Sequence, residues 1–174
     1  KIGELIMLAT NLQPFLMGIA VSVLVGIALT LPISSAAICA AFGLTGLAGG
    51  AAVAGCCAQM VGFAVMSFKE NRWGGLVSQG IGTSMLQMGN IIKNPRIWIA
   101  PIVTSAITGP MATCLFKLQM NGTPVSSGMG TCGFVGQIGV YSGWVNDIAN
   151  GTKAAITGFD WTGMILISFI LPAV

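Results

Sequence analysis

The sequence contains no histidine and little charge, with seven Lys or Arg and four Asp or Glu among 174 residues. Charged residues make up 6% of the chain, against about 25% in an average soluble domain. A soluble protein of this size with so few charges would expose large apolar patches and aggregate. The scarcity of charge therefore excludes a soluble domain.

The lack of histidine also limits the chemistry. No Ser-His-Asp or Cys-His set can form within the chain, and the four carboxylates form no spaced pair inside an apolar segment. Five cysteines lie in apolar or Gly-rich stretches without Cys-x-x-Cys spacing, which indicates packing residues rather than a zinc or redox site. We expect a protein that is not an enzyme, with no catalytic residues, no metal and no cofactor.

Apolar residues are abundant instead, at 55% of the chain and a mean hydropathy of +0.89. A charge at the bilayer centre costs about 3 kcal/mol, so long charge-free stretches indicate membrane-buried segments. These stretches are residues 5–68, 73–92, 97–116, 118–146 and 161–174. The net charge of +3 fits the positive-inside bias of cytoplasmic loops and does not indicate nucleic-acid binding.

The first apolar stretch predicts two transmembrane helices with a broken element between them. Residues 12–31 form the clearest span, with Pro14 in its first turn, Pro32 at its end, and Gly18, Ser22 and Gly26 as a stripe of small residues for close helix packing. Residues 33–68 are too long for one crossing and too short for two. We expect a short helix at 33–46, a Gly-rich break at 45–50, a crossing at 48–68 and a hydrophilic loop at 69–72.

A neutral polar stripe runs through residues 74–92. Gln79, Thr83, Gln87 and Asn90 are spaced by four, four and three, which predicts one helical face. Basic residues flank both ends, so this stretch either enters and returns on one side as a re-entrant hairpin or lies in the membrane interface. Because Lys and Arg usually dominate an interfacial polar face, we favour a face that lines a solute cavity over an interfacial helix.

A second crossing and a second broken segment follow. Residues 97–116 predict a helix kinked near its middle by interior Pro101 and Pro110. Residues 121–143 are too polar and Gly-rich for a lipid-facing helix, yet they carry no charge, as expected of irregular backbone that lines a wet cavity. Its candidate solute contacts are the hydroxyls and exposed backbone of Ser126, Ser127, Gly128, Gly130 and Thr131.

Glycines recur every third or fourth residue from 130 to 143, which predicts close packing after the broken segment. Gly128, Gly130 and Gly133 also spell G-x-G-x-x-G, but no strand or βαβ pattern surrounds them, so a dinucleotide site is rejected. Asp147 is either a solvated loop residue or a solute contact at a cavity mouth. Trp144 and Trp161 are candidate interfacial anchors.

Four segments carry a family resemblance: LPISSAAI at 31–38, NRWGGLVSQGIGTSMLQ at 71–87, GPMAT at 109–113 and NGTPVSSGMGTCG at 121–133. From about residue 12 onward the chain resembles the bacterial phosphotransferase-system enzyme IIC-like membrane proteins. More narrowly, it resembles the branch of toxin regulators of the perfringolysin-regulator type. The resemblance implies a sugar-permease-like fold with re-entrant elements, a homodimer and a bacterial cell membrane. The Gly-Ile-Thr-Glu type signature of established sugar permeases is absent.

The sequence thus predicts an all-α, polytopic membrane protein with about five crossings and two broken or re-entrant elements. We expect residues 1–174 to form one transmembrane domain of a longer polypeptide, since 161–174 would span about 21 Å of a roughly 30 Å bilayer core. The leading function is a permease-like protein for a small polar, sugar-like solute. The alternative is a membrane regulator or sensor without net transport that relays to a cytoplasmic partner.

Overall fold

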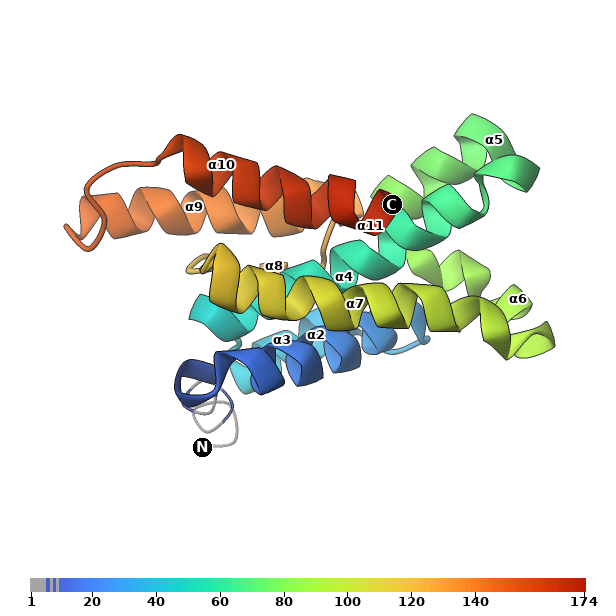
Figure 1. Cartoon of the computed structure of the whole chain (residues 1–174), viewed down its shortest axis with the longest axis horizontal. Coiled ribbons are helices and arrows are strands. Elements are labelled where there is room, and N and C mark those ends of the chain that lie inside the picture. Colours follow the sequence, from blue (N-terminus) through green and yellow to red (C-terminus); the bar gives the residue numbers. More distant parts are fainter. Residues whose placement is uncertain (1–5, 7, 9) are drawn as a thin grey trace.

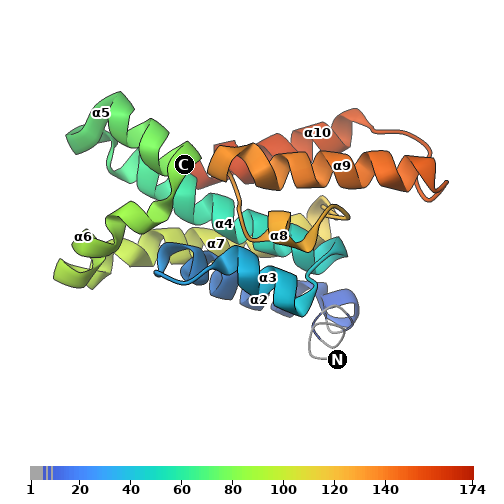
Figure 2. The ribbon, with the colours of Figure 1, turned by 180° about the vertical axis from the view of Figure 1, so that it is seen from behind.

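The computed structural model describes residues 6, 8 and 10–174, and within this part the chain is helical (Figures 1 and 2). No strand forms among the described residues; one isolated antiparallel bridge joins Gly46 and Met120. The predicted all-α membrane fold with broken elements is confirmed.

In chain order the elements are α2 (Pro14–Thr30), α3 (Ser35–Phe42), α4 (Gly46–Met66), α5 (Phe68–Val77), the π-helix η1 (Ser78–Gly82), the 3₁₀-helix η2 (Ser84–Gln87), α6 (Met88–Lys93), the 3₁₀-helix η3 (Pro95–Trp98), α7 (Ile99–Pro110), the π-helix η4 (Met111–Leu115), α8 (Pro124–Ser127), the 3₁₀-helix η5 (Cys132–Phe134), α9 (Val135–Ala149), α10 (Gly158–Ile165), the π-helix η6 (Leu166–Ile170) and α11 (Leu171–Ala173).

Two helices in the described chain are long and apolar enough to cross a bilayer. They are α4 and the continuous Pro95–Leu115, which joins η3, α7 and η4. Pro14–Thr30 and Gly158–Ala173 are apolar but shorter. The expected count of five crossings therefore stays a prediction.

Helix α4 is the centre of the molecule, packed against α2 and α7 (Figures 1 and 2). Residues 51–57 are buried along their whole length because Ala, Gly and Cys let neighbouring helices approach. A Cβ on Gly26 would lie 2.8 Å from the carbonyl oxygen of Gly55, and one on Gly18 would lie 2.6 Å from Thr113 Oγ1. The small-residue stripe predicted on the first helix is thus confirmed as a packing face.

The predicted break at 45–50 was wrong by several residues. Helix α3 ends at Gly43, whose φ of +63° caps it in the left-handed conformation, and α4 already begins at Gly46. The glycines that suggested a break serve packing inside α4 instead, since a Cβ on Gly49 would lie 3.2 Å from the Met120 carbonyl oxygen. The hydrophilic loop predicted at 69–72 was also wrong, because these residues lie in α5, which is interrupted only at Arg72, with φ 51°.

The two prolines of the second long helix lie near its changes of helix type, from η3 to α7 and from α7 to η4. Pro101 lies in the first turn of α7, where a missing N–H costs little. Pro110 is followed at once by the π-helix η4, a widened turn that accommodates the lost hydrogen bond. The helix thus changes type after Pro110, and the kink expected near its middle stays a prediction.

Residues 67–93 form a helical hairpin. The chain enters through α5 and η1, breaks at Thr83 in extended conformation, and returns through η2 and α6. Both α5 and α6 lie at the end of the molecule opposite the α9–α10 connection (Figure 1). The hairpin geometry predicted for 74–92 is therefore observed.

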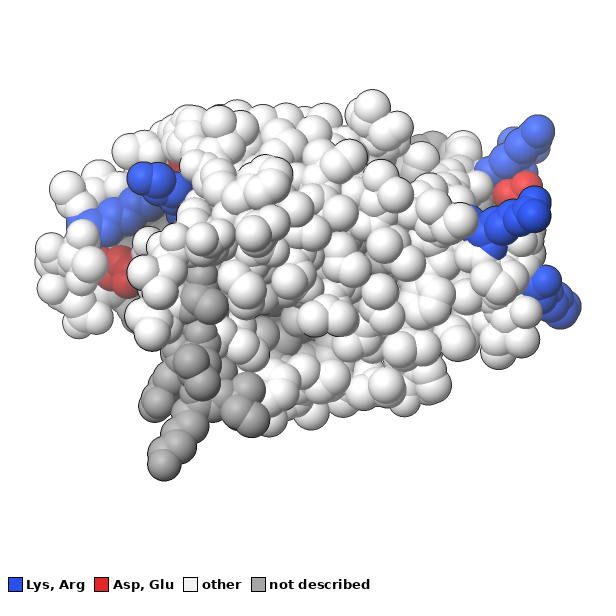
Figure 3. All heavy atoms as spheres, turned by 60° about the horizontal axis from the view of Figure 1, so that its bottom comes forward, with Lys and Arg blue, Asp and Glu red and all other residues white. Residues whose placement is uncertain are grey.

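Charged side chains gather at these two ends, and the surface between them is uncharged (Figure 3). One end carries the hairpin and η3, and the other carries the segment after η4 and the α9–α10 connection. An uncharged band between charged ends is the surface expected of a protein whose middle lies in hydrocarbon.

The glycines of α9 face the broken segment. A Cβ on Gly143 would lie 2.7 Å from the Asn121 backbone nitrogen, and one on Gly139 would clash with the Ser126 side chain. The predicted close packing is therefore confirmed, although its partner is the irregular chain at 121–130 and not another long helix.

The α2–α4 contact supplies a test of this packing. A Cβ on Gly55 would overlap the Ser22 backbone carbonyl, whereas one on Gly89 meets nothing within 4 Å. We expect Gly55→Ala to lower the free energy of unfolding by about 1–3 kcal/mol through overpacking, and Gly89→Ala to leave it unchanged or raise it. Thermal unfolding of both variants and the wild type in one detergent measures the two effects. A melting temperature of Gly55→Ala equal to that of the wild type would contradict the tight α2–α4 contact.

Candidate functional site

Three amide side chains of the hairpin form a hydrogen-bonded chain, here called the amide cluster (Gln79, Gln87 and Asn90). Asn90 Nδ2 donates to Gln87 Oε1 at 2.8 Å, and Gln87 Nε2 donates to Gln79 Oε1 at 2.9 Å. Gln79 Nε2 in turn donates to Ser67 Oγ at 3.0 Å. The cluster thus joins the entering arm of the hairpin to its returning arm.

A pocket of about 390 Å³ opens beside this cluster. Gln87 and Asn90 line it, while Gln79 lies behind Gln87. The other lining residues are Phe63, Met66, Ser67, Glu70, Asn71 and Ile97. Amides, a hydroxyl, a carboxylate and apolar side chains therefore meet in one cavity at the hairpin end.

The fourth member of the predicted stripe lies apart. Thr83 is the extended residue at the hairpin break, and its hydroxyl accepts a hydrogen bond from the Met85 backbone nitrogen. The stripe was therefore wrong as a single helical face, because the helix is interrupted between Gln79 and Gln87. The three amides come together instead because the hairpin folds its returning arm against its entering arm.

A second polar network, which the sequence analysis missed, surrounds the fully buried Gln59 in α4. Trp98 Nε1 and Thr30 Oγ1 donate to Gln59 Oε1 at 3.0 and 3.2 Å, and Gln59 Nε2 donates to Ser105 Oγ at 3.4 Å. The hydroxyl of Thr30 also lies 3.0 Å from that of Ser84 at the hairpin break. The one amide in an otherwise apolar segment at 46–66 was the available signal.

The predicted hydroxyl contacts of the broken segment are used in packing. Ser127 Oγ donates to the Pro124 carbonyl at 2.6 Å, and the Ser126 and Thr123 hydroxyls pair at 2.9 Å. Thr131 Oγ1 donates to the Gly80 carbonyl of the hairpin. The structure does not place these hydroxyls in the pocket beside the amide cluster.

The two glycines predicted as solute contacts, Gly128 and Gly130, are also used in packing. The Gly128 carbonyl accepts a hydrogen bond from Ser35 Oγ at 2.7 Å. Gly130 has a φ of +54°, and a Cβ there would lie 2.6 Å from the Cβ of Cys56. Both residues hold the broken segment against α3 and α4.

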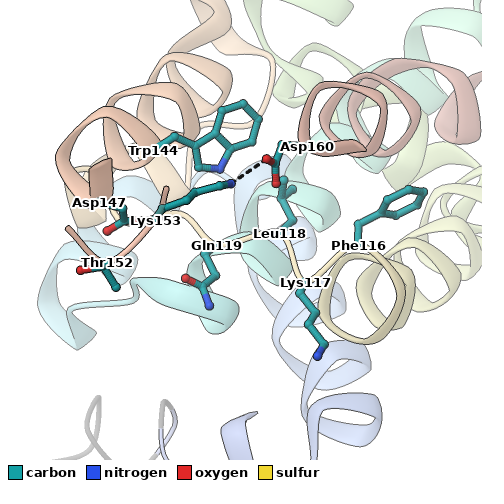
Figure 4. Close-up of a pocket in the computed structure, with 9 residues that line it drawn as sticks. All are labelled: Phe116, Lys117, Leu118, Gln119, Trp144, Asp147, Thr152, Lys153 and Asp160. Atoms are coloured by element: carbon teal, nitrogen blue, oxygen red, sulfur yellow. Dashed lines mark ion pairs between the residues drawn. The ribbon is translucent and has the colours of Figure 1, made fainter. Parts of the chain in front are cut away.

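Asp147 lies at the opposite end of the molecule, in a pocket of about 240 Å³ (Figure 4). Its carboxylate accepts a hydrogen bond from Asn121 Nδ2 at 2.8 Å. In the same pocket Lys153 Nζ lies 2.7 Å from Asp160 Oδ2 and 5.1 Å from the ring centre of Trp144. The structure therefore separates Asp147 from the amide cluster.

The two tryptophans predicted as interfacial anchors, Trp144 and Trp161, lie at or beside this second pocket. Trp144 is only 2% exposed and packs under Lys153, so it does not serve as a lipid-facing anchor. Trp161 remains 42% exposed and contacts both Trp144 and Tyr141.

Asp160 belongs to the capping box at the start of α10, beside the loop. Partial burial raises the pKa of its carboxyl, but hydrogen bonds from Lys153 and from Thr157 outweigh this effect, so the pKa lies below its ordinary value. The carboxylate therefore stays charged and paired at neutral pH.

Within the described part of the chain no group of three or more His, Cys, Asp or Glu side chains is placed to hold a metal ion. The cysteines there are free: Cys39, Cys56 and Cys57 are buried, Cys132 is half-buried and Cys114 is exposed.

The whole chain, residues 1–174, matches the family described as "Phosphotransferase system, EIIC". The chain belongs to this family. Comparisons with curated proteins and with solved structures found no match. Membership makes the chain a membrane component of sugar transport, which works with a sugar and with other components of the phosphotransferase system. Such a component is a permease and not a catalyst by itself.

The Gln59 network supplies one prediction. Gln59→Leu would leave the indole N–H of Trp98 without its acceptor and Thr30 with one partner fewer, and an unsatisfied buried polar group costs about 1–3 kcal/mol. We expect a lower unfolding temperature and faster hydrogen exchange in η2, which Thr30 holds through Ser84. A variant with wild-type exchange in η2 would contradict a link between the network and the hairpin.

The lowered pKa of Asp160 supplies a prediction about how stability depends on pH. The stabilisation by its ion pair is present above the unfolded-state pKa, about 3.9, and is lost as the pH falls through the lower folded-state pKa. We expect Asp160→Asn to unfold at a lower temperature than wild type at pH 7, with the difference shrinking below about pH 4. A difference that stays constant from pH 7 to pH 3 would assign Asp160 a neutral packing role.

Proposed function

We propose that this chain binds a small, sugar-like solute in the pocket beside the amide cluster, as part of a permease. The observation that carries the proposal is the meeting of Gln87, Asn90 and Glu70 around one cavity of about 390 Å³. The cavity lies at the feet of the hairpin, between the end of α4, the start of α5 and the returning arm. Broken elements such as this hairpin are where transporters often hold their substrates.

The lining chemistry suits a polyhydroxylated solute. An amide donates and accepts hydrogen bonds without a charge having to be desolvated, so it can pair with a hydroxyl in either role. Glu70 adds a carboxylate that forms no ion pair with any described residue. Phe63, Met66 and Ile97 offer apolar surface for the C–H faces of a sugar ring.

The remaining predicted residues take supporting parts in this proposal. Thr131 holds the carbonyl of Gly80, the residue after Gln79, and so positions the hairpin. Ser126, Ser127, Gly128 and Gly130 hold the broken segment against its neighbours. The pocket around Asp147 is a separate polar contact region at the far end.

A regulator of the perfringolysin-regulator type, without net transport, is the alternative. The observation that favours it is the set of four exposed cations at the hairpin end, which a cytoplasmic partner would meet: Lys69, Arg72, Lys93 and Arg96. The two functions share solute binding and differ in flux, so uptake of a bound sugar into proteoliposomes separates them. A homodimer is the assembly we propose for either function.

The binding proposal is tested with a panel of hexoses, hexitols and hexose phosphates on the purified protein. A ligand of the folded state raises the melting temperature by mass action. We expect at least one sugar to stabilise the protein and Asn90→Ala or Gln87→Ala to weaken its binding. The expected loss is about 2- to 13-fold per lost hydrogen bond, from roughly 0.5–1.5 kcal/mol each.

Asn146→Ala is the matched control, because Asn146 is an exposed amide near the C-terminal end of α9, and that end of the helix lies opposite the hairpin feet (Figure 1). Its binding should equal that of the wild type. Two results would overturn the proposal: equal affinities for wild type and Asn90→Ala, or a folded protein that no member of the panel stabilises.

A further inference from the structure

Charge is distributed unequally between the two ends of the molecule. The hairpin end carries Lys69, Arg72, Lys93 and Arg96, with Glu70 as its one acid, a net charge of +3. At the opposite end two lysines are balanced by two aspartates, Lys117 and Lys153 against Asp147 and Asp160. The described part of the molecule therefore has one basic end and one neutral end (Figure 3).

The four cations of the hairpin end, here called the basic group (Lys69, Arg72, Lys93 and Arg96), are exposed. None of them forms an ion pair with a described residue. At the neutral end, by contrast, Lys153 is paired with Asp160 and stacked on Trp144. The basic group is thus charge available for an anionic partner.

Large apolar side chains stand directly beside these cations. Trp73 follows Arg72 and is 71% exposed, and Ile92 precedes Lys93 and is also 71% exposed. Trp next to Lys or Arg is typical of the membrane–water interface, where rings lie at headgroup level and cations reach the phosphates. A surface that alternates exposed Trp, Ile and cations fits a lipid headgroup layer better than a soluble protein.

We propose that the basic group binds the anionic phospholipid headgroups of the cytoplasmic leaflet, so that the hairpin end and the amide pocket face the cytoplasm. Each Lys or Arg near an anionic leaflet contributes on the order of 1 kcal/mol, and the positive-inside rule selects the end richer in Lys and Arg.

The same headgroups also hold the two feet of the hairpin. Lys69 and Arg72 stand at its entry, and Lys93 and Arg96 at its exit. Its middle is tied to the core by the Thr30–Ser84 pair and by Thr131, which donates to Gly80. The amide cluster lies between these attachments, so anionic lipid fixes the element that carries it. This coupling to the pocket rests on the proposed function; the headgroup site and the orientation do not.

Headgroup binding is tested with the protein in nanodiscs of phosphatidylcholine alone or with 30% phosphatidylglycerol added. We expect the anionic lipid to raise the melting temperature of the wild type and to slow hydrogen exchange at 78–90. Arg96→Gln and Lys93→Gln should each reduce this increment, and the fourfold Gln variant should remove it. Lys117→Gln, which removes one of the two cations at the neutral end, should keep the full increment.

An equal increment in the wild type and the fourfold variant would overturn the headgroup site, as would no increment in the wild type. Neither result depends on a solute, so this measurement can overturn the headgroup site without overturning the proposed sugar binding, and the sugar screen can do the reverse. Slowed exchange at 78–90 without any effect of the lipid on sugar affinity would overturn only the coupling to the pocket.

The orientation is tested by cysteine labelling of the intact protein in its native membrane. The background carries Cys114→Ser and Cys132→Ser, which removes the thiols that are not buried. Asn94→Cys at the hairpin end and Asn150→Cys at the neutral end form a matched, exposed pair. A membrane-impermeant maleimide should label the first only in inside-out vesicles and the second only in right-side-out vesicles. The reverse pattern, or labelling of each from both sides, would overturn the orientation.

Discussion

A buried amide in an apolar medium constrains the whole arrangement. Gln59 lies fully buried in the middle of the most buried helix, and an unpaired amide in hydrocarbon costs several kcal/mol. Its partners come from α2, η3 and α7, through Thr30, Trp98 and Ser105. Each helix must therefore hold its register, because a slip of one residue would leave the amide unpaired.

That network forms only because small residues remove the side chains between the helices. Gly26 lies against Gly55, and Ser22 Oγ donates to the Ser105 carbonyl at 2.6 Å, so α2, α4 and α7 meet nearly backbone to backbone. The hairpin depends on this core in turn, since Thr30 bonds to both Gln59 and Ser84. Close packing thus fixes the network, the network fixes the break in the hairpin, and the break sets where the amide cluster lies.

The sequence predicted what depends on composition and charge, and it failed where the geometry depends on distant contacts. The clustering of charge predicted the uncharged surface between two charged ends, and basic residues on both sides of 74–92 indicated a return to the same end. The spacing of Gln79, Gln87 and Asn90 selected residues that do gather, although through a broken helix. Gln59 was missed because a single amide has no periodicity. The separation of Asp147 from the amides was not predictable, because sequence spacing does not report which end of the fold a helix reaches.

Family membership and site geometry support each other through the chemistry of exchangeable bonds. The amides of the cluster bond to one another, so each of them has a hydrogen-bond partner. A sugar hydroxyl both donates and accepts, and it can replace one amide–amide bond while satisfying both amides. In the proposed binding, two amide–hydroxyl bonds replace one amide–amide bond and the bonds that the hydroxyl made to water, and the apolar side of the pocket adds its contacts. A sugar-transport component needs this balance, because a solute held too firmly would not be released.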